Sequence, residues 1–176
     1  MIGERRITPS AVAAGLREVT WPARLQKLKP GPLAGDTPMW VDAAHNPGGA
    51  ATLAAAITAS REEGERVAIV FAIQAVKDVE GVLGELLPVI DELVLCPLPD
   101  SGGQEGGPGA DPRHVAGIAA TLGRKARIAE NLPDAVGLAR ESGAKLLTQR
   151  LQLKTGQHVL GASFDAEGFA PSAAGA

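Results

Sequence analysis

The chain has 176 residues, enough for one domain with a buried core but too few for two comfortable ones. Apolar residues make up 45% and the net charge is −3 with both signs interspersed, so most of the chain should fold, and a basic nucleic-acid-binding face is excluded. The single cysteine, Cys96, excludes an internal disulfide, and its apolar neighbours favour a buried, inert thiol.

The amino-terminal residues show no targeting pattern. Glu4, Arg5 and Arg6 stand where a secretion signal would need an apolar run. The longest strongly apolar window, 67–75, is far shorter than a membrane span. We therefore expect a cytoplasmic protein that has neither a membrane nor a nucleic acid as its partner.

The first half of the chain begins with a short helix and a proline-rich lead-in. Thr8 and Pro9 fit an N-cap and a first helical residue, and predict a helix over 9–18. Residues 21–33 contain three prolines and are expected to be extended or irregular. Strands and helices then alternate: a strand over 39–42, a helix over 48–63, a β-branched strand over 67–73, a helix over 78–87 and a strand over 91–96.

The second half opens with a glycine- and proline-rich loop over 97–109, which is expected to be mobile. Beyond residue 149 the pattern decays: 149–160 is compatible with a hairpin, and 161–176 is expected to be disordered. Between these regions we expect a helix over 111–122, a short strand over 126–128, a helix over 131–142 and a strand over 145–148.

This alternation predicts the fold class. Strands joined by helices at this spacing form right-handed crossovers and a largely parallel sheet with helices on both faces. The prediction is therefore an α/β fold, a three-layer sandwich with a mostly parallel sheet and Rossmann-like character.

Polar side chains crowd after the first two strands of this alternation. If those strands are neighbours, their polar residues converge at one rim of the sheet, where α/β proteins bind ligands. A helix beginning near Gly48 adds unpaired N–H groups, which favour a phosphate or a carboxylate. The residues are Asp42, His45 and Asn46 after the first strand, and Gln74, Lys77 and Asp78 after the second.

Each of these residues also has an ordinary structural interpretation. His45 and Lys77 could simply be solvated, and Asp78 could cap a helix. Gly48-Gly49 is neither a P-loop nor a dinucleotide fingerprint, and the three histidines lie too far apart for a zinc site. Spacing alone therefore leaves the anion site and these structural roles open.

Three blocks of sequence resemble the C-terminal domain of the bifunctional dihydrofolate synthase/folylpolyglutamate synthase family, within the Mur ligase superfamily. Their order and separation match over about residues 5–148. The resemblance implies a Rossmann-like Mur ligase C-terminal (glutamate ligase) domain over 1–148. The blocks are Trp21-Pro22-Ala23-Arg24-Leu25-Gln26, Trp40-Val41-Asp42-Ala43-Ala44-His45-Asn46-Pro47 and Phe71-Ala72-Ile73-Gln74-Ala75-Val76-Lys77-Asp78.

The resemblance implies an ATP-dependent amide ligase of folate biosynthesis and one-carbon metabolism. In that family ATP phosphorylates a carboxylate of a pteroate or folate, and the amine of L-glutamate attacks the acyl phosphate. By position, the implied ATP contacts are Arg24, Asp42, His45 and Asn46. His45 and Lys77 are the implied catalytic residues, and Lys77 with Asp78 lies near the glutamate or the phosphates. No metal ligand is implied in this chain, since the Mg²⁺ ligands lie mainly on the family's N-terminal domain.

The chain also departs from the family pattern. Val76 replaces the first acid of an Asp-Lys-Asp motif, and Thr148-Gln149-Arg150-Leu151 replaces a Gly-Ser-Leu-Tyr-like segment. The P-loop pattern Gly-x-x-x-x-Gly-Lys-[Ser/Thr] does not occur in the 176 residues. We therefore expect a detached or truncated C-terminal half with a divergent tail over 149–176, inactive unless a P-loop domain is supplied in cis or in trans.

Three alternatives remain at this point. The domain could belong to a ligase of peptidoglycan precursors, which shares Asp-x-x-His-Asn-Pro-like blocks. It could be a non-catalytic module that binds a nucleotide or another anion. A nicotinamide-dependent dehydrogenase is disfavoured, because its glycine fingerprint does not follow the first strand.

Overall fold

The computed structural model describes residues 7–18, 23–32, 35–98, 107–149, 162–165 and 168–171. Within these ranges one sheet has the strand order β1-β2-β6-β3-β4-β5. The strands from β2 to β5 in this order run parallel, and β1 pairs antiparallel with β2 at one edge. The strands are β1 (Gln26–Lys27), β2 (Met39–Asp42), β3 (Val67–Phe71), β4 (Glu92–Leu95), β5 (Ala126–Ile128) and β6 (Lys145–Gln149).

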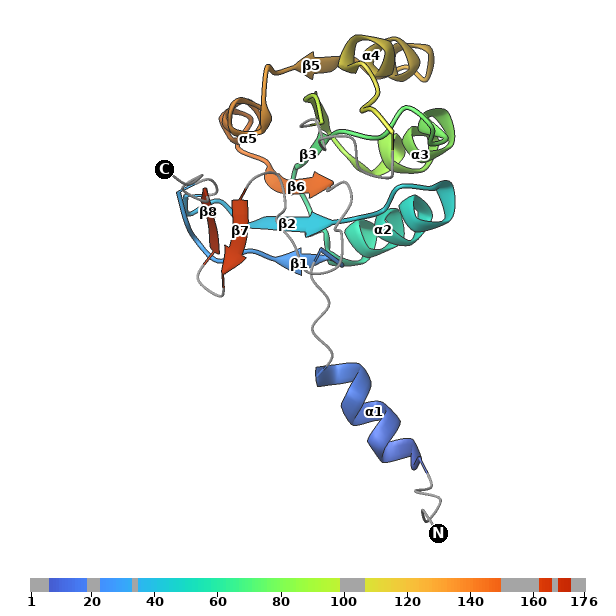
Figure 1. Ribbon diagram of the computed structural model, residues 1–176, viewed down its shortest axis with the longest axis vertical. Helices are drawn as coiled ribbons and strands as arrows, with labels where there is room; N and C mark the ends of the chain where they lie inside the picture. The colour runs from blue at the N-terminus through green and yellow to red at the C-terminus, as the bar shows by residue number, and fades with distance from the viewer. Residues whose placement is uncertain are drawn as a thin grey trace.

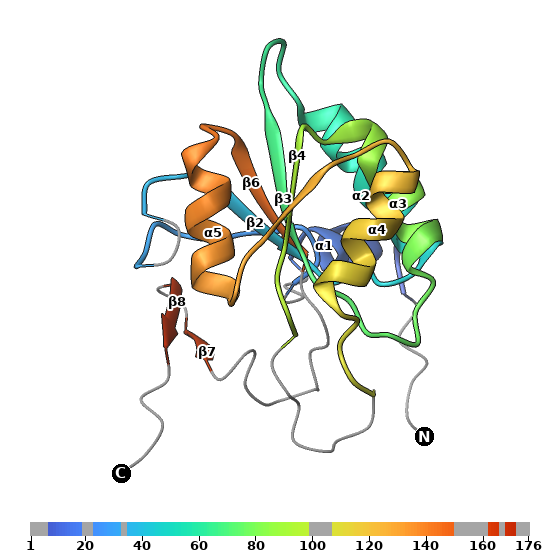
Figure 2. The same ribbon diagram turned by 90° about the horizontal axis from the view of Figure 1, so that it is seen from above.

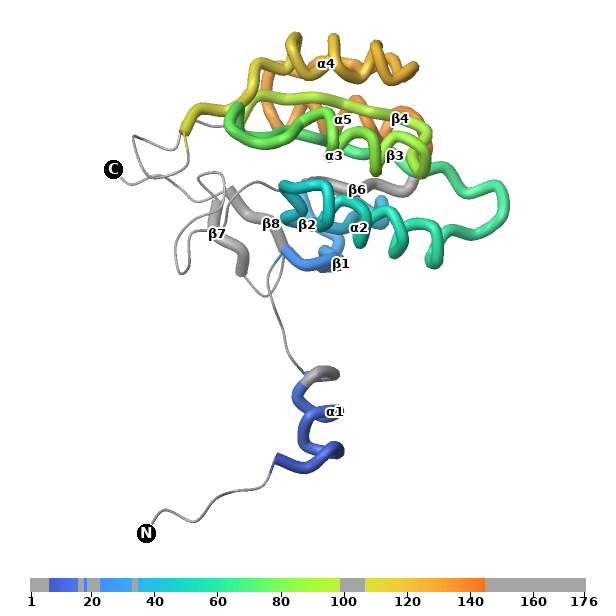
Figure 3. The backbone as a smooth tube through the Cα atoms, turned by 90° about the vertical axis from the view of Figure 1, so that its right-hand side faces the viewer, coloured from blue at the N-terminus to red at the C-terminus, as the bar shows by residue number. Residues whose placement is uncertain are grey.

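Helices cover both faces of this sheet. The helices α2 (Pro47–Ser60), α3 (Val79–Leu86) and α4 (Pro112–Thr121) lie on one face, and α5 (Leu132–Glu141) lies on the other (Figure 2). A 3₁₀ turn, η1 (Leu87–Val89), extends α3. Figures 1 and 3 show α1 (Pro9–Glu18) standing away from the sheet. The predicted three-layer α/β sandwich with a mostly parallel sheet is confirmed.

The helix starts follow from short polar side chains in the sequence. The side chains of Asn46, Asp78, Asp111 and Asn131 each accept a hydrogen bond from a backbone N–H in the first turn that follows. Such caps satisfy N–H groups that the helix itself leaves unpaired. In α2, α4 and α5 a proline also occupies one of the first two helical positions, where its missing N–H costs nothing.

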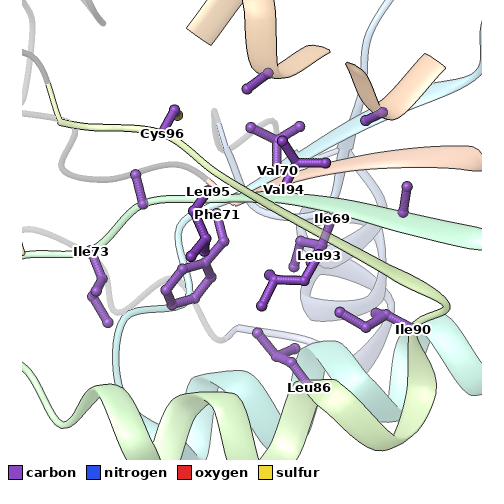
Figure 4. Close-up of a cluster of buried hydrophobic side chains, with 14 of the residues drawn as sticks. Ile69, Val70, Phe71, Ile73, Leu86, Ile90, Leu93, Val94, Leu95 and Cys96 are labelled. Atoms are coloured by element: carbon purple, nitrogen blue, oxygen red, sulfur yellow. The ribbon is translucent and has the colours of Figure 1, made fainter. Parts of the chain in front are cut away.

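The core lies on both sides of the central strands. All five residues of β3 are buried, which explains why that strand is apolar throughout rather than alternating. Figure 4 shows Ile69 and Leu93 on the side of α2 and α3, and Val70 and Val94 on the side of α5. The central strands β3 and β4 are therefore covered on both faces of the sheet.

The structure adds one strand that the sequence analysis left irregular. The pair Gln26–Lys27 forms β1, and the N–H of Leu28 donates to the carbonyl of Met39 at 2.9 Å. Two residues are too short a run for alternation to be visible, so the strand exists because β2 offers a free edge. The Lys27 ammonium also lies 5.5 Å from the centre of the Trp40 ring.

The expected disorder over 161–176 needs correction at two short segments. β7 (Ala162–Asp165) and β8 (Gly168–Pro171) pair antiparallel, with Phe164 opposite Phe169. Phenylalanine favours strands, whereas the prediction weighed only the many small residues. The hairpin over 149–160 lies outside the described residues except for Gln149, which ends β6, and the predicted mobile loop lies outside them at 99–106.

The described ranges contain no helix with the length and apolar character needed to cross a membrane.

Candidate functional site

The carboxyl end of β2 is organised by the buried carboxylate of Asp42. One carboxylate oxygen accepts a hydrogen bond from the N–H of Ala44 at 2.8 Å, and the other accepts one from the N–H of Leu25, also at 2.8 Å. Asp42 is only 8% exposed. The carboxylate thus ties the segment before β1 to the segment after β2, which are distant in sequence.

Arg24 sits in a tight turn beside this carboxylate. The antiparallel register places Gln26 opposite Val41, so residues 23–25 lie just past the end of β2. The Arg24 side chain is exposed, and within the described ranges it has no hydrogen-bond or ion-pair partner. Trp21 and Pro22, which begin the same sequence block, lie outside the described residues.

His45 and Asn46 follow Asp42 on the loop into α2. The His45 Nδ1 lies 2.9 Å from the Ala43 carbonyl oxygen, which can only accept, so Nδ1 carries a proton and donates it. In the neutral ring Nε2 is then left as an acceptor. The Asn46 Oδ1 accepts from the N–H of Gly49 at 2.8 Å, and this leaves the side-chain NH₂ as a donor.

Lys77 and Asp78 lie on the loop between β3 and α3. Asp78 Oδ1 accepts from the N–H of Gly81 at 2.9 Å, which confirms the capping interpretation of Asp78. The Lys77 side chain is half-buried and has no ion-pair partner in the part of the chain that the structure describes. The loop is anchored at its start, because the N–H of Ala75 donates to the Pro108 carbonyl at 3.0 Å.

The helices that follow the two loops come together, although not in the way the sequence analysis assumed. β2 and β3 are not neighbours, since β6 lies between them and pairs parallel with both. The contact is made one layer away, by the helices. A Cβ placed on Gly81 of α3 would lie 2.8 Å from Pro47 Cγ of α2. The amino ends of α2 and α3 are therefore adjacent, with the Asp42–Asn46 loop and the Lys77–Asp78 loop on either side.

Two polar residues near the carboxyl ends of the strands have structural roles that the sequence did not indicate. Gln26 accepts a hydrogen bond from the N–H of Ala23 through its side-chain oxygen at 2.9 Å. Gln74 is 3% exposed, and its backbone forms a bridge with Gly109. Neither role has a local signal, because in each case the partner is fixed by how β1 or the 107–110 segment folds back.

The thiol and the acids at this edge do not form a reactive or metal-binding cluster. Burial raises the pKa of Cys96 to about 11, which keeps the thiol protonated and confirms the expected buried, inert group. Among the described residues no three His, Cys, Asp or Glu side chains are grouped as metal ligands would be. The carboxylates of Asp42 and Asp78 accept backbone N–H groups, whereas the side chains of Arg24 and Lys77 have no ion-pair partner among the described residues.

A parallel three-layer α/β domain in which two helix amino ends are adjacent at the carboxyl ends of the strands is suited to a phosphate- or carboxylate-bearing ligand. The model of the Mur ligase, glutamate ligase domain matches residues 24–148. The chain belongs to this family, and the resemblance seen in the three sequence blocks is confirmed.

Individual relatives agree with the family. The chain is 34% identical over 142 residues to the dihydrofolate synthase/folylpolyglutamate synthase of Mycobacterium tuberculosis strain H37Rv, covering 77% of this chain and 26% of that protein. It thus spans about a quarter of the length of that curated relative.

Solved structures are similar too. A Mycobacterium tuberculosis folylpolyglutamate synthase complexed with ADP and AMPPCP matches with 28% identity and a TM-score of 0.64, over 82% of this chain and 33% of that one. E. coli FolC in complex with ADP matches with 24% identity and a TM-score of 0.62, over 82% of this chain and 32% of that one, and shows the shared fold.

Proposed function

We propose that the chain is the glutamate ligase domain of an ATP-dependent amide ligase that adds L-glutamate to dihydropteroate or folate. The support is the family, the names of the relatives and the ADP bound in a similar solved structure. One observation carries the proposal to this chain's own residues. Arg24 and Lys77 lack anionic partners among the described residues; Lys77 directly precedes the cap of α3, and Leu25, next to Arg24, donates its N–H to Asp42 at the start of the loop that leads to α2.

The residues around β2 would face the nucleotide. Arg24 would bind a phosphate of ATP through its guanidinium, which can donate two parallel hydrogen bonds. The Nε2 of His45 and the NH₂ of Asn46 would contact the nucleotide from the same loop. A nucleotide contact by Asp42 would use the lone pairs that remain on its oxygens, since each already accepts one backbone N–H.

The loop after β3 would serve the reacting groups. The γ-phosphoryl group of ATP is transferred to a carboxylate of the pteroate or folate, with ADP leaving. The deprotonated amine of glutamate then attacks the acyl carbon and releases phosphate, and in both steps negative charge develops on oxygen atoms. A fixed ammonium beside them lowers the barrier, and we assign this role to Lys77. Asp78 would act chiefly by holding the start of α3, with its second oxygen left to meet the glutamate ammonium.

The proposed reaction requires a partner domain. The P-loop pattern does not occur in the sequence, and no three-residue metal cluster is found in the described ranges. We therefore assign the groups that bind the triphosphate, the Mg²⁺ ligands and most of the folate site to a P-loop domain acting in cis or in trans. Mg²⁺ would supply charge neutralisation at the phosphates, while this chain supplies Arg24, His45 and Lys77.

Reconstitution tests the proposal. The chain is mixed with ATP, Mg²⁺, dihydropteroate and L-glutamate, with and without the P-loop domain of a full-length relative, and released phosphate is measured. We expect glutamate-dependent phosphate release only when both parts are present. Turnover by the chain alone would contradict the division of labour, and activity only with peptidoglycan precursors would move the chain to that branch. Nucleotide binding without any turnover in the assembly would favour a non-catalytic module.

A further inference from the structure

The turn that carries Arg24 has an unusual backbone. Ala23 and Leu25, on either side of Arg24, have φ angles of +56° and +44°. Residues with a side chain rarely adopt this left-handed region, because the backbone is strained there unless its surroundings hold it in place. Among the described residues these are the two positive-φ positions that are not glycine. The turn is therefore kept in a conformation that its own sequence does not favour.

Two side chains hold this turn from outside. The Gln26 Oε1 accepts from the N–H of Ala23 at 2.9 Å, and the Asp42 carboxylate accepts from the N–H of Leu25 at 2.8 Å. Each strained residue thus has its own side-chain acceptor. Gln26 lies on β1 and Asp42 at the end of β2, and these strands are paired. The sheet itself therefore fixes the backbone on both sides of Arg24.

We propose that Gln26 is a positioning residue for the phosphate contact made by Arg24, and that Asp42 is a second one. The two hydrogen bonds, from the Ala23 N–H to Gln26 and from the Leu25 N–H to Asp42, form a brace for the turn. The proposal rests on the proposed function, which assigns that phosphate contact to Arg24. An exposed arginine loses conformational entropy when it binds, and fixing its backbone in advance lowers that cost. The other oxygen of Asp42 binds the N–H of Ala44, so the same brace sets Arg24 relative to His45.

The brace can be measured on the chain alone, independently of any ligand. Trypsin cleaves after arginine, and Arg24 is exposed, so cleavage of the Arg24–Leu25 bond reports how often the turn opens. We expect Gln26→Ala and Asp42→Asn to accelerate this cleavage about tenfold, the effect of about 1.4 kcal/mol on the opening equilibrium. Gln26→Glu keeps the Oε1 acceptor and should restore slow cleavage. Cleavage after Arg113, on α4, should be unchanged and separates local opening from general unfolding.

The positioning role is measured in the assembled ligase. Gln26→Ala should lower kcat/KM for ATP about tenfold and leave KM for glutamate unchanged, whereas general damage would affect both. Gln26→Glu should recover most of the loss. In an Arg24→Ala background, Gln26→Ala should cause no further loss, because Gln26 acts only through Arg24.

The outcomes separate this inference from the proposed function. If Arg24→Ala lowers kcat/KM for ATP but Gln26→Ala does not, or if the two losses multiply in the double variant, the positioning role is overturned and the phosphate contact stands. If Arg24→Ala itself has no effect, the phosphate contact fails and the positioning role with it, even where trypsin shows a braced turn. Unchanged cleavage after Arg24 in both Gln26→Ala and Asp42→Asn would overturn the brace.

Discussion

The amino ends and the carboxyl ends of the parallel strands carry the same kinds of charged side chain, but these side chains have different partners. At the amino ends of the strands, arginines are bound to protein acceptors: Arg61 to Asp91 at 2.7 Å, Arg66 to the Ser142 carbonyl at 3.2 Å, and Arg124 to three carbonyls. At the carboxyl ends the cations Arg24 and Lys77 have no such partner within the described residues.

The acids at the carboxyl ends, unlike the cations there, do have protein partners among the described residues. At the carboxyl edge Asp42 and Asp78 accept backbone N–H groups rather than pairing with the nearby cations. An arginine satisfied by carbonyls contributes to stability, whereas one left to solvent is available to a ligand. From this difference we expect partners, rather than residue type, to distinguish structural charges from ligand-binding ones in this domain.

The largest expected effect concerns Arg24. Arg24→Ala should lower kcat/KM of the assembled ligase by about 10²–10³-fold, as the loss of one charge-stabilising donor does. The free energy of unfolding should change by less than about 0.5 kcal/mol, because the side chain is exposed and unpaired among the described residues. Phosphate release and urea denaturation measure the two effects, with Arg113→Ala as the matched surface control. A loss of stability without a loss of activity would contradict the prediction that Arg24 differs from the arginines at the amino ends of the strands.

Arg124 should behave in the opposite way. Its guanidinium donates to the carbonyls of Leu87 and Ile90 at 3.0 Å and of Asp91 at 3.3 Å. Arg124→Ala leaves these partly buried acceptors without their donor and should cost about 2–3 kcal/mol. Urea denaturation of the chain measures the loss, and kcat/KM of the folded assembly should be unchanged. A variant as stable as the parent would show that water replaces the guanidinium without cost.

Two glycines of α3 test the contact between the helix amino ends. A methyl group at Gly81 would collide with the Asp78 carboxylate and lie 2.8 Å from Pro47 Cγ, whereas at Gly84 it would meet nothing within 4 Å. Gly81→Ala should cost about 1 kcal/mol through the displaced cap, and Gly84→Ala should gain about 0.5–1 kcal/mol of helix propensity. Thermal unfolding of both variants measures the difference. Equal effects would mean that neither the Asp78 cap nor the contact with Pro47 resists a methyl group at Gly81.

The smallest effect concerns the pH dependence of the amino edge. Burial acts to raise the pKa of the Asp91 carboxyl, but the Val67 N–H and the Arg61 guanidinium outweigh it, so the pKa lies below its usual value. The carboxylate therefore stabilises the fold above about pH 4, and this contribution is lost as the pH falls through the lowered pKa.

Denaturation from pH 7 down to pH 2 checks this sign. The parent chain should exceed Asp91→Asn by less than about 1 kcal/mol at neutral pH, because the pair with Arg61 is partly exposed, and the gap should close in acid. In an Arg61→Ala background, Asp91→Asn should lower the free energy of unfolding by less at neutral pH than it does in the parent chain. A gap that widens in acid would reverse the assignment.

Local patterns predicted the elements of this domain well where the chain itself supplies the signal. The strand over 39–42 and the helix over 9–18 have the predicted bounds, and Asp78 is the cap that its position suggested. These features depend on neighbouring residues only. The short β1 was missed because two residues carry too little periodicity, and the pairing in 162–171 was missed because the many small residues outweighed the two phenylalanines.

The candidate site residues stay predictions, whereas the expected strand neighbours at the site can be compared with the structure. The blocks around Arg24, Asp42 and Lys77 identified the family, while the assumption that β2 and β3 are neighbours was wrong. The individual ligand contacts stay predictions. Gln26 ends the first sequence block, but its role was not indicated, since that role depends on a strand pairing that no sequence pattern marks.

The sequence by itself determined the alternation of strands and helices, the caps, the buried β3 and the family, because each is written in residues close together or in blocks of fixed spacing. Tertiary structure alone decided that β6 enters between β2 and β3, that two helix amino ends meet, and that one carboxylate ties the Arg24 turn to the His45 loop. The physical reason is that strand order and long-range hydrogen bonds depend on which free edges and acceptors remain once the core is packed.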